Sequence, residues 1–136
     1  MAHESVLDFV RANPRGVLAT YRRDGQAQLS PVTDGVDAEG RVVISTREGA
    51  MKTLNLTRNP RAGLCVFSER FFGEWHNLEG NVEIVHLPDA MEPLVDYYRR
   101  VSGEHPDWEE YRAAMVRDRR VLVRITVDRS GPITQG

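Results

Sequence analysis

The chain has 136 residues, with 18 basic and 20 acidic side chains and a formal net charge of −2. This length predicts a single domain, and a hydrophobic content of 40% excludes intrinsic disorder. The near-neutral charge argues against a nucleic-acid-binding protein, and no apolar run is long enough to span a membrane.

The cysteine content and the first residues indicate the cellular compartment of the protein. Cys65 is the single cysteine, so we expect neither an internal disulfide nor a cysteine-based metal site. The opening residues MAHES are not a basic segment followed by an apolar stretch, so no secretory leader is indicated. We therefore expect a cytoplasmic protein.

The first half of the chain predicts one short helix and three strands. An apolar stripe with helical spacing indicates a helix over 5–13, which ends before Pro14. Hairpin-connected strands follow at residues 16–21, 26–33 and 41–46, with turns at Asp24-Gly25 and Glu39-Gly40. Pro31 lacks a backbone donor, so we expect it at a sheet edge or a bulge.

The second half adds helices and three more strands. Helical spacing predicts helices near 51–58, at 88–101 and at 107–116. The remaining strands are expected at 62–67, 74–86 and 120–127. Gly80 lies inside the long strand, where a glycine indicates a bulge or a close approach of two backbones. We predict that residues 129–136 form a flexible tail.

These elements predict a mainly β fold of the β-rich α+β kind. Six antiparallel strands with three or four short peripheral helices fit a small barrel in one domain over residues 1–136, with its core at about 5–128. Strands and helices do not alternate strictly, which argues against a doubly wound parallel sheet.

Familiar catalytic and metal-binding patterns are missing from the sequence. The four histidines share no metal-ligand spacing, so we expect no metal site. The sequence also contains no nucleophile elbow, Walker loop or dinucleotide fingerprint. No catalytic residue can therefore be named from motifs.

The most suggestive local feature is a strand-to-helix junction at residues 45–53. Ser45 and Thr46 end a strand, Gly49 follows, and Lys52, the single lysine, stands in the first turn of a helix. Backbone donors and a lysine at a helix N-terminus favour a phosphate. The alternative is that hydroxyls and glycine merely cap the helix.

Motifs along the whole chain resemble the pyridoxamine 5'-phosphate oxidase-like split β-barrel proteins. The likeness rests on the segments GVLAT, DG and SPV of the opening strands, on the segment KTLNLTRNPRA and on the strand WHNLEG. In the second half, GEHPDW, YR, AMV and DRRVL resemble the branch that binds the deazaflavin coenzyme F420. The likeness extends over residues 16–127.

This resemblance implies an FMN-binding-type split β-barrel homodimer whose cofactor ring lies in a groove between subunits. Lys52 would pair with the phosphate, and Asn55 would hold the helix or touch the cofactor. At the two positions before the lysine, relatives often carry arginine, whereas this chain has Ala50 and Met51. The implied cofactor-binding residues are Ser30, Pro31, Val32, Thr33, Ser45, Thr46, Ala50, Met51, Lys52, Asn55 and Trp75.

The implied function is an oxidoreductase that transfers hydride from reduced F420 to an electron-poor, conjugated organic substrate, biliverdin-like tetrapyrroles being one example. Two alternatives remain: an FMN-dependent oxidoreductase of the same fold, and a non-catalytic cofactor carrier. The expected partners are a second copy of the chain and a small-molecule substrate, without nucleic acid or membrane.

Three further groups of side chains have interpretations of their own. Helical spacing assigns Trp108, Tyr111 and Met115 to core packing. The pair Phe71-Phe72 indicates an interface or the rim of a groove. Near Asp118, the arginines at 117, 119 and 120 are expected to form a solvated face.

Overall fold

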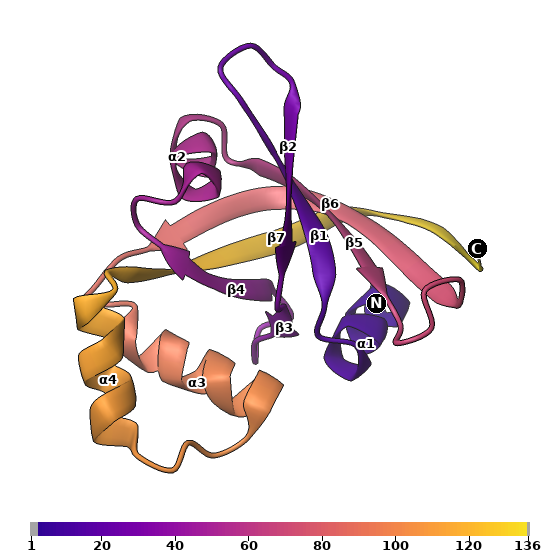
Figure 1. The fold of residues 1–136 in the computed structure, drawn as a ribbon. Coiled ribbons are helices and arrows are strands. Elements are labelled where there is room, and N and C mark those ends of the chain that lie inside the picture. The colour runs from indigo at the N-terminus through magenta and orange to yellow at the C-terminus, as the bar shows by residue number, and fades with distance from the viewer. Residues whose placement is uncertain (1–2, 136) are drawn as a thin grey trace.

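The computed structural model describes residues 3–135 as a curled antiparallel sheet with helices around it (Figure 1). Within this range the helices are α1 (Glu4–Ala12), α2 (Met51–Arg58), α3 (Met91–Ser102) and α4 (Trp108–Arg117). The strands are β1 (Gly16–Tyr21), β2 (Ala27–Val32), β3 (Gly35–Val36), β4 (Val42–Arg47), β5 (Arg61–Phe67), β6 (Glu74–Val85) and β7 (Arg120–Gln135).

The strand order is β2-β1-β5-β6-β7-β4-β3, and every neighbouring pair is antiparallel. The mainly β fold is confirmed, with seven strands in place of six. The additional strand, β3, has only two residues, which is too short to leave a periodic pattern in the sequence. The hairpin between β1 and β2 forms across Gly25, whose φ of 86° suits glycine.

The expected run of three hairpin-connected strands is wrong at its third member. The Glu39-Gly40 turn joins β3 to β4, and β4 pairs with β7 at the end of the sheet opposite to β2. The pairing has a physical basis in β4 and β7, because both carry apolar residues on both faces. Both faces of these strands are covered.

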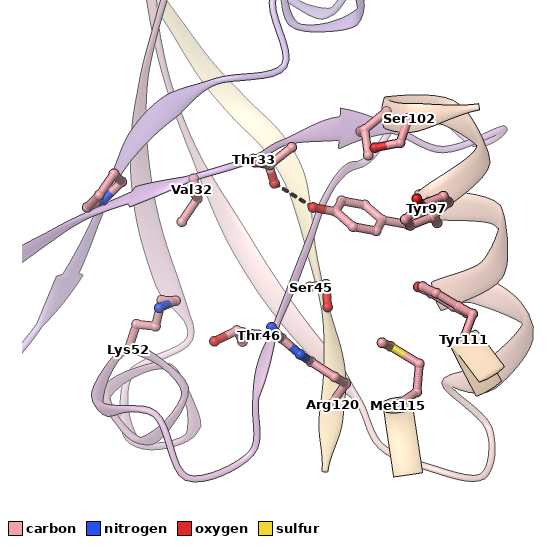
Figure 2. Close-up of a pocket in the computed structure, with 13 residues that line it drawn as sticks. Val32, Thr33, Ser45, Thr46, Lys52, Tyr97, Ser102, Tyr111, Met115 and Arg120 are labelled. Carbon is pink, nitrogen blue, oxygen red and sulfur yellow. Dashed lines mark hydrogen bonds between the residues drawn. The ribbon is translucent and has the colours of Figure 1, made fainter. Parts of the chain in front are cut away.

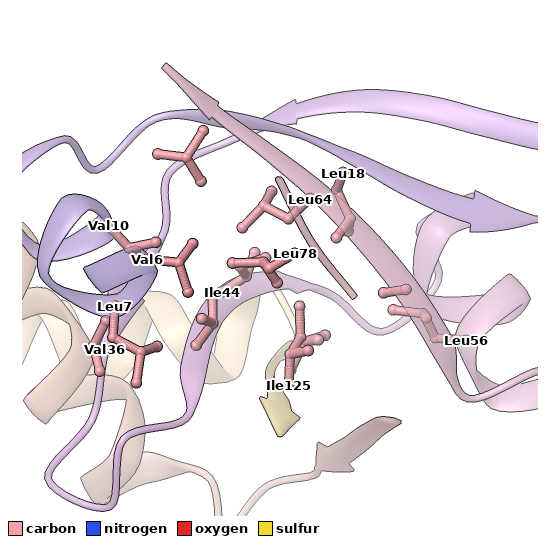
Figure 3. Close-up of a cluster of buried hydrophobic side chains, with 14 residues drawn as sticks. Val6, Leu7, Val10, Leu18, Val36, Ile44, Leu56, Leu64, Leu78 and Ile125 are labelled. Carbon is pink, nitrogen blue, oxygen red and sulfur yellow. The ribbon is translucent and has the colours of Figure 1, made fainter. Parts of the chain in front are cut away.

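Two hydrophobic clusters lie on opposite faces of β4 and β7. Ile44 and Ile125 point into the main core beneath α1 (Figure 3). Val43 and Leu122 point the other way and pack against α3 and α4. Successive side chains of a strand alternate between faces, so the continuous apolar runs in these strands serve two layers at once.

The predictions for Pro31 and Gly80 are both confirmed. Pro31 lies in β2, the outermost strand at one edge of the sheet. At Gly80 the register of β6 with β7 shifts, and a Cβ there would stand 2.1 Å from the carbonyl oxygen of Thr126. A side chain at position 80 would therefore force the two strands apart.

The C-terminal segment differs from the predicted flexible tail. Strand β7 continues to Gln135, and residues 130–135 pair with the first half of β6. The backbone groups of this part of β6 need partners on both sides, and the extended end of β7 supplies one set. Residue 136 lies outside the described residues.

Candidate functional site

A cavity of about 560 Å³ lies at the strand-to-helix junction that the sequence singled out (Figure 2). It is bounded by the ends of β2 and β4, by α2, by α3 and α4, and by the first residue of β7. Its lining residues are Pro31, Val32, Thr33, Ser45, Thr46, Lys52, Tyr97, Tyr98, Val101, Ser102, Tyr111, Met115 and Arg120. A cavity of this size is in the range of small-molecule sites.

One part of this cavity is positively charged, so we call it the cationic cavity. Lys52 and Arg120 supply the charges, and the hydroxyl residues Ser45 and Thr46 lie on β4 near them (Figure 2). None of the described residues that line the cavity is acidic. The cavity is therefore suited to a ligand with a negatively charged group.

The position of Lys52 follows from the way α2 begins. Ala50 has an extended conformation and its carbonyl accepts the first helical hydrogen bond, from Leu54 N at 3.0 Å. The hydroxyl of Thr53 donates to the Arg47 carbonyl at 2.6 Å and ties the helix to the end of β4. Lys52 thus stands in the first helical turn, where the helix dipole also favours an anion.

Asn55 fixes α2 against the sheet. Its side-chain amide is buried and donates to Thr20 Oγ1 and Gln28 Oε1, each at 3.1 Å. Its oxygen accepts from the Arg58 guanidinium at 3.1 Å. These bonds tie α2 to β1 and β2.

The wall opposite Lys52 is built from α3 and α4 and is largely aromatic. The Tyr97 hydroxyl donates to the Thr33 carbonyl at 2.9 Å (Figure 2), and the Tyr111 hydroxyl donates to the Leu94 carbonyl at 2.9 Å. Both rings are buried, and Met115 packs beside them. The predicted core role of Tyr111 and Met115 is confirmed, and the same side chains also line the cationic cavity.

The structure brings together six of the eleven predicted cofactor-binding residues. These six, which line one cavity, are Pro31, Val32, Thr33, Ser45, Thr46 and Lys52. The other five do not line it: Ser30, Ala50, Met51, Asn55 and Trp75. Of these, Met51 is 58% exposed at the start of α2, and the hydroxyl of Ser30 is buried without a hydrogen-bond partner among the described residues.

Trp75 lies in a second depression, which we call the apolar hollow. Its volume is about 290 Å³, and its lining residues are Cys65, Phe67, Phe71, Phe72 and Trp75. The two phenylalanine rings at its edge are 75% and 73% exposed. Exposed aromatic rings gathered at one place indicate a contact surface.

Seven of the thirteen lining residues were not among the predicted binding residues, and Arg120 is the charged one among these seven. It was expected on a solvated face, whereas it is half-buried in the cationic cavity, and its Nε has no hydrogen-bond partner among the described residues. Its location depends on the pairing of β7 with β4, which joins segments distant in sequence. No local pattern in the sequence could have signalled it.

Asp34 is a buried carboxyl directly behind the wall of the cationic cavity. It follows Thr33 and has no exposed surface, and neither of its side-chain oxygens has a hydrogen-bond partner among the described residues. Burial raises the pKa of Asp34 from 3.8 to about 8. The carboxyl is therefore mainly protonated, and neutral, at pH 7.

The curled antiparallel sheet with a cavity beside its short helix is that of the flavin-binding split β-barrel proteins. A family model described as pyridoxamine 5'-phosphate oxidase matches residues 2–132. The chain belongs to this family. Its members are generally oxidoreductases and bind flavin-type cofactors.

Three solved structures with the same fold are described as proteins of different kinds. The conserved hypothetical protein Rv2991 from Mycobacterium tuberculosis is 28% identical, with a TM-score of 0.77 over 96% of this chain and 82% of that one. A structure described as an F420 reductase is 22% identical, with a TM-score of 0.70 over 96% and 97%. The heme storage protein HutZ from Vibrio cholerae is 15% identical, with a TM-score of 0.72 over 100% and 98%.

In residues 3–135, the helices are all too short or too polar to cross a membrane.

Proposed function

We propose that this protein is an F420-dependent oxidoreductase that transfers hydride to an electron-poor, conjugated organic substrate. The cationic cavity is the observation that carries this proposal, because it combines fixed positive charge with an aromatic wall in a space of about 560 Å³. The F420 reductase among the structural neighbours, matched over 97% of its length, supports the deazaflavin as a candidate cofactor for this fold.

The residues present fit a cofactor with a phosphate-bearing chain. Lys52 would hold the phosphate, with Ser45 and Thr46 as hydroxyl donors beside it. The buried Nε of Arg120 has no partner among the described residues and could donate to an anionic group of the cofactor. When bound, the deazaflavin supplies the hydride, which explains why the chain needs no catalytic constellation of its own.

The chain's own residues position the ligands and exclude water. The backbone of Thr33 is held by Tyr97, so this part of the wall is rigid. Tyr97, Tyr98 and Tyr111 present aromatic faces to a flat substrate such as a biliverdin-like tetrapyrrole. Both the Tyr97 and the Tyr111 hydroxyls donate to backbone carbonyls, so we expect the transferred proton to come from solvent.

The proposal includes a homodimer, since proteins of this fold typically dimerise. In one chain Trp75 lies in the apolar hollow and not in the cationic cavity. In the proposed dimer the apolar hollow of one copy covers the cationic cavity of the other copy. Trp75 would then border the ring of the cofactor bound by the partner. The exposed Phe71 and Phe72 rings would be buried in this contact.

An FMN-dependent oxidoreductase is the second candidate, and the family match over residues 2–132 favours it. FMN has a phosphate on the same kind of chain, so Lys52 would serve it equally. F420 and FMN have different absorbance spectra, which makes the two candidates directly separable.

The test is titration of the purified protein with F420 and with FMN, followed by stopped-flow oxidation of the reduced complex. We expect F420 to bind more tightly than FMN, and a conjugated acceptor from a panel that includes biliverdin to oxidise the reduced complex faster than buffer does. Preference for FMN would establish the second candidate. Tight F420 binding without any accelerating acceptor would leave a carrier and refute the enzyme.

A further inference from the structure

We propose that Arg120 is a specificity-determining residue of the cationic cavity. Together with Lys52 it binds the acidic tail of the cofactor, and the cavity therefore selects cofactors that have such a tail over neutral ring compounds that lack it. This inference rests on the proposed function, because it takes the ligand to be a deazaflavin or flavin with an anionic tail. Arg120 gives the cavity a second cation besides Lys52.

The position of Arg120 is set by a tight turn between α4 and β7. Arg119 has a φ of 51°, in the left-handed region, and its carbonyl accepts a hydrogen bond from Glu48 N at 2.8 Å. This bond joins the start of β7 to the loop before α2. Arg120 then pairs with Arg47 across the two strands, and Figure 2 shows its side chain extending toward Thr46.

Among the arginines that form no ion pair in the described residues, Arg120 is the one that lines the cationic cavity. Arg61 pairs with Asp128 and Arg112 pairs with Glu92. Arg124, on the same strand, also has a buried Nε without a partner among the described residues, but its Nη1 donates to Glu83 at 3.2 Å. Among the described residues, Arg120 takes part in no ion pair, and its buried Nε donates to nothing. A buried donor without a partner destabilises the protein, and an incoming anion would relieve this by accepting its hydrogen bond.

The other arginines near α2 do not take this role. The Arg58 guanidinium donates to the Tyr21 carbonyl at 2.7 Å and to Asn55, so it faces β1. Arg47 is exposed and does not line the cavity. Of the basic residues near the junction, Lys52 and Arg120 are therefore the pair that the cavity brings together.

The surroundings of Arg120 leave its charge free for a ligand. Burial raises the pKa of Tyr97 and of Tyr111 to about 12, with the nearby Arg120 charge as a smaller, opposing influence. Both phenols are therefore neutral at pH 7 and do not compensate the guanidinium. Lys52 has a compact ammonium charge, and Arg120 has a planar guanidinium with several donors. Together they can bind two anionic groups of one cofactor tail.

The experiment compares cofactors with and without their acidic tails. The wild type, Arg120→Gln and Arg120→Lys are titrated with F420 and with its tailless deazaflavin fragment, and with FMN and riboflavin. Arg124→Gln is the matched control, because it removes the same charge from the same strand outside the cavity. The thermal shift with inorganic pyrophosphate is measured for each protein, since it reports anion binding without any ring.

We expect Arg120→Gln to weaken F420 binding about tenfold or more while changing the affinity for the tailless fragment by less than about twofold. Arg120→Lys should recover part of the loss, and Arg124→Gln should resemble the wild type. An equal loss for tailed and tailless ligands would make Arg120 a structural residue of the wall. No loss for either would also overturn the inference.

The pyrophosphate arm separates this inference from the proposed function. If the wild type binds neither F420 nor FMN, yet pyrophosphate stabilises the wild type and not Arg120→Gln, the proposed function fails and the anion site at Arg120 stands. If F420 binds wild type and Arg120→Gln equally, the inference fails and the proposed function stands.

Discussion

The cationic cavity and the apolar hollow are both open depressions, but they differ in what they can bind alone. The cavity places Lys52 and Arg120 beside hydroxyl donors, so one chain can supply the whole charged part of a site. The hollow is lined by aromatic side chains and one cysteine, with two rings largely exposed. It offers area and no charge, which suits a protein surface better than a polar cofactor. This difference predicts that removing a charge from the cationic cavity lowers ligand affinity. Removing an aromatic ring from the apolar hollow should instead weaken dimer formation.

The largest expected effect is on assembly. The double substitution of Phe71→Ser and Phe72→Ser removes two rings that the proposed dimer buries, at a cost of about 3 kcal/mol or more, or roughly a hundredfold in the dimer dissociation constant. Sedimentation velocity over a concentration series measures it. A protein that stays dimeric at the same concentration as wild type would show that the apolar hollow is not the interface.

Substitution of Lys52 should affect ligand binding and leave assembly unchanged. Lys52→Ala removes a charge-assisted contact worth about 1.5–3 kcal/mol, so F420 affinity should fall at least tenfold with the dimer intact. Arg58→Gln is the control, since it removes a positive charge from the same helix outside the cavity. Unchanged affinity in Lys52→Ala would remove this residue from the site.

The placement of α2 should be sensitive to Asn55. Asn55→Ala leaves the hydroxyl of Thr20 and the amide of Gln28 without their shared partner, at a cost of about 1–3 kcal/mol in unfolding free energy. Chemical denaturation measures this loss, with the exposed Thr57→Ala on the same helix as a control. A stability equal to that of wild type would show that α2 is held by its apolar contacts alone.

The pH dependence of stability should report on Asp34, the carboxyl behind the cavity wall. Because the pKa of Asp34 is raised from 3.8 to about 8, the folded state retains a proton that the unfolded state has lost between these values. The free energy of unfolding should therefore fall as pH rises through this range. Above the range it should stay lowered by the full amount.

Asp34→Asn cannot ionise and should flatten that dependence. Relative to wild type, its melting temperature should rise between about pH 4 and about pH 9, by about 3 °C or more. Differential scanning calorimetry at several pH values measures the difference, and the exposed Glu109→Gln serves as a control. A difference between Asp34→Asn and wild type that is independent of pH would contradict the raised pKa.

Local features of the fold were predictable because local sequence determines them. Helix α2 ends at Arg58, before the Asn-Pro pair, as expected, and Pro31 lies on an edge strand because it lacks a donor. The bulge at Gly80 follows from the missing side chain. Each of these depends on a few neighbouring residues.

What could not be predicted depends on pairing between distant segments. The partner of β4 is β7, which begins more than seventy residues later in the chain. That pairing decides both the failure of the expected hairpin order and the position of Arg120. The six predicted residues that line the cavity came from the resemblance and from the junction at 45–53, whereas the tyrosine wall depends on how α3 and α4 pack.

Pro31 has a consequence for behaviour in concentrated solution. The free side of β2 would otherwise present a regular row of amide donors to any other extended chain. The proline interrupts that row, which disfavours pairing with a further strand at the edge where Leu29 is 66% exposed. A single imino acid thus acts as a gatekeeper against polymerisation.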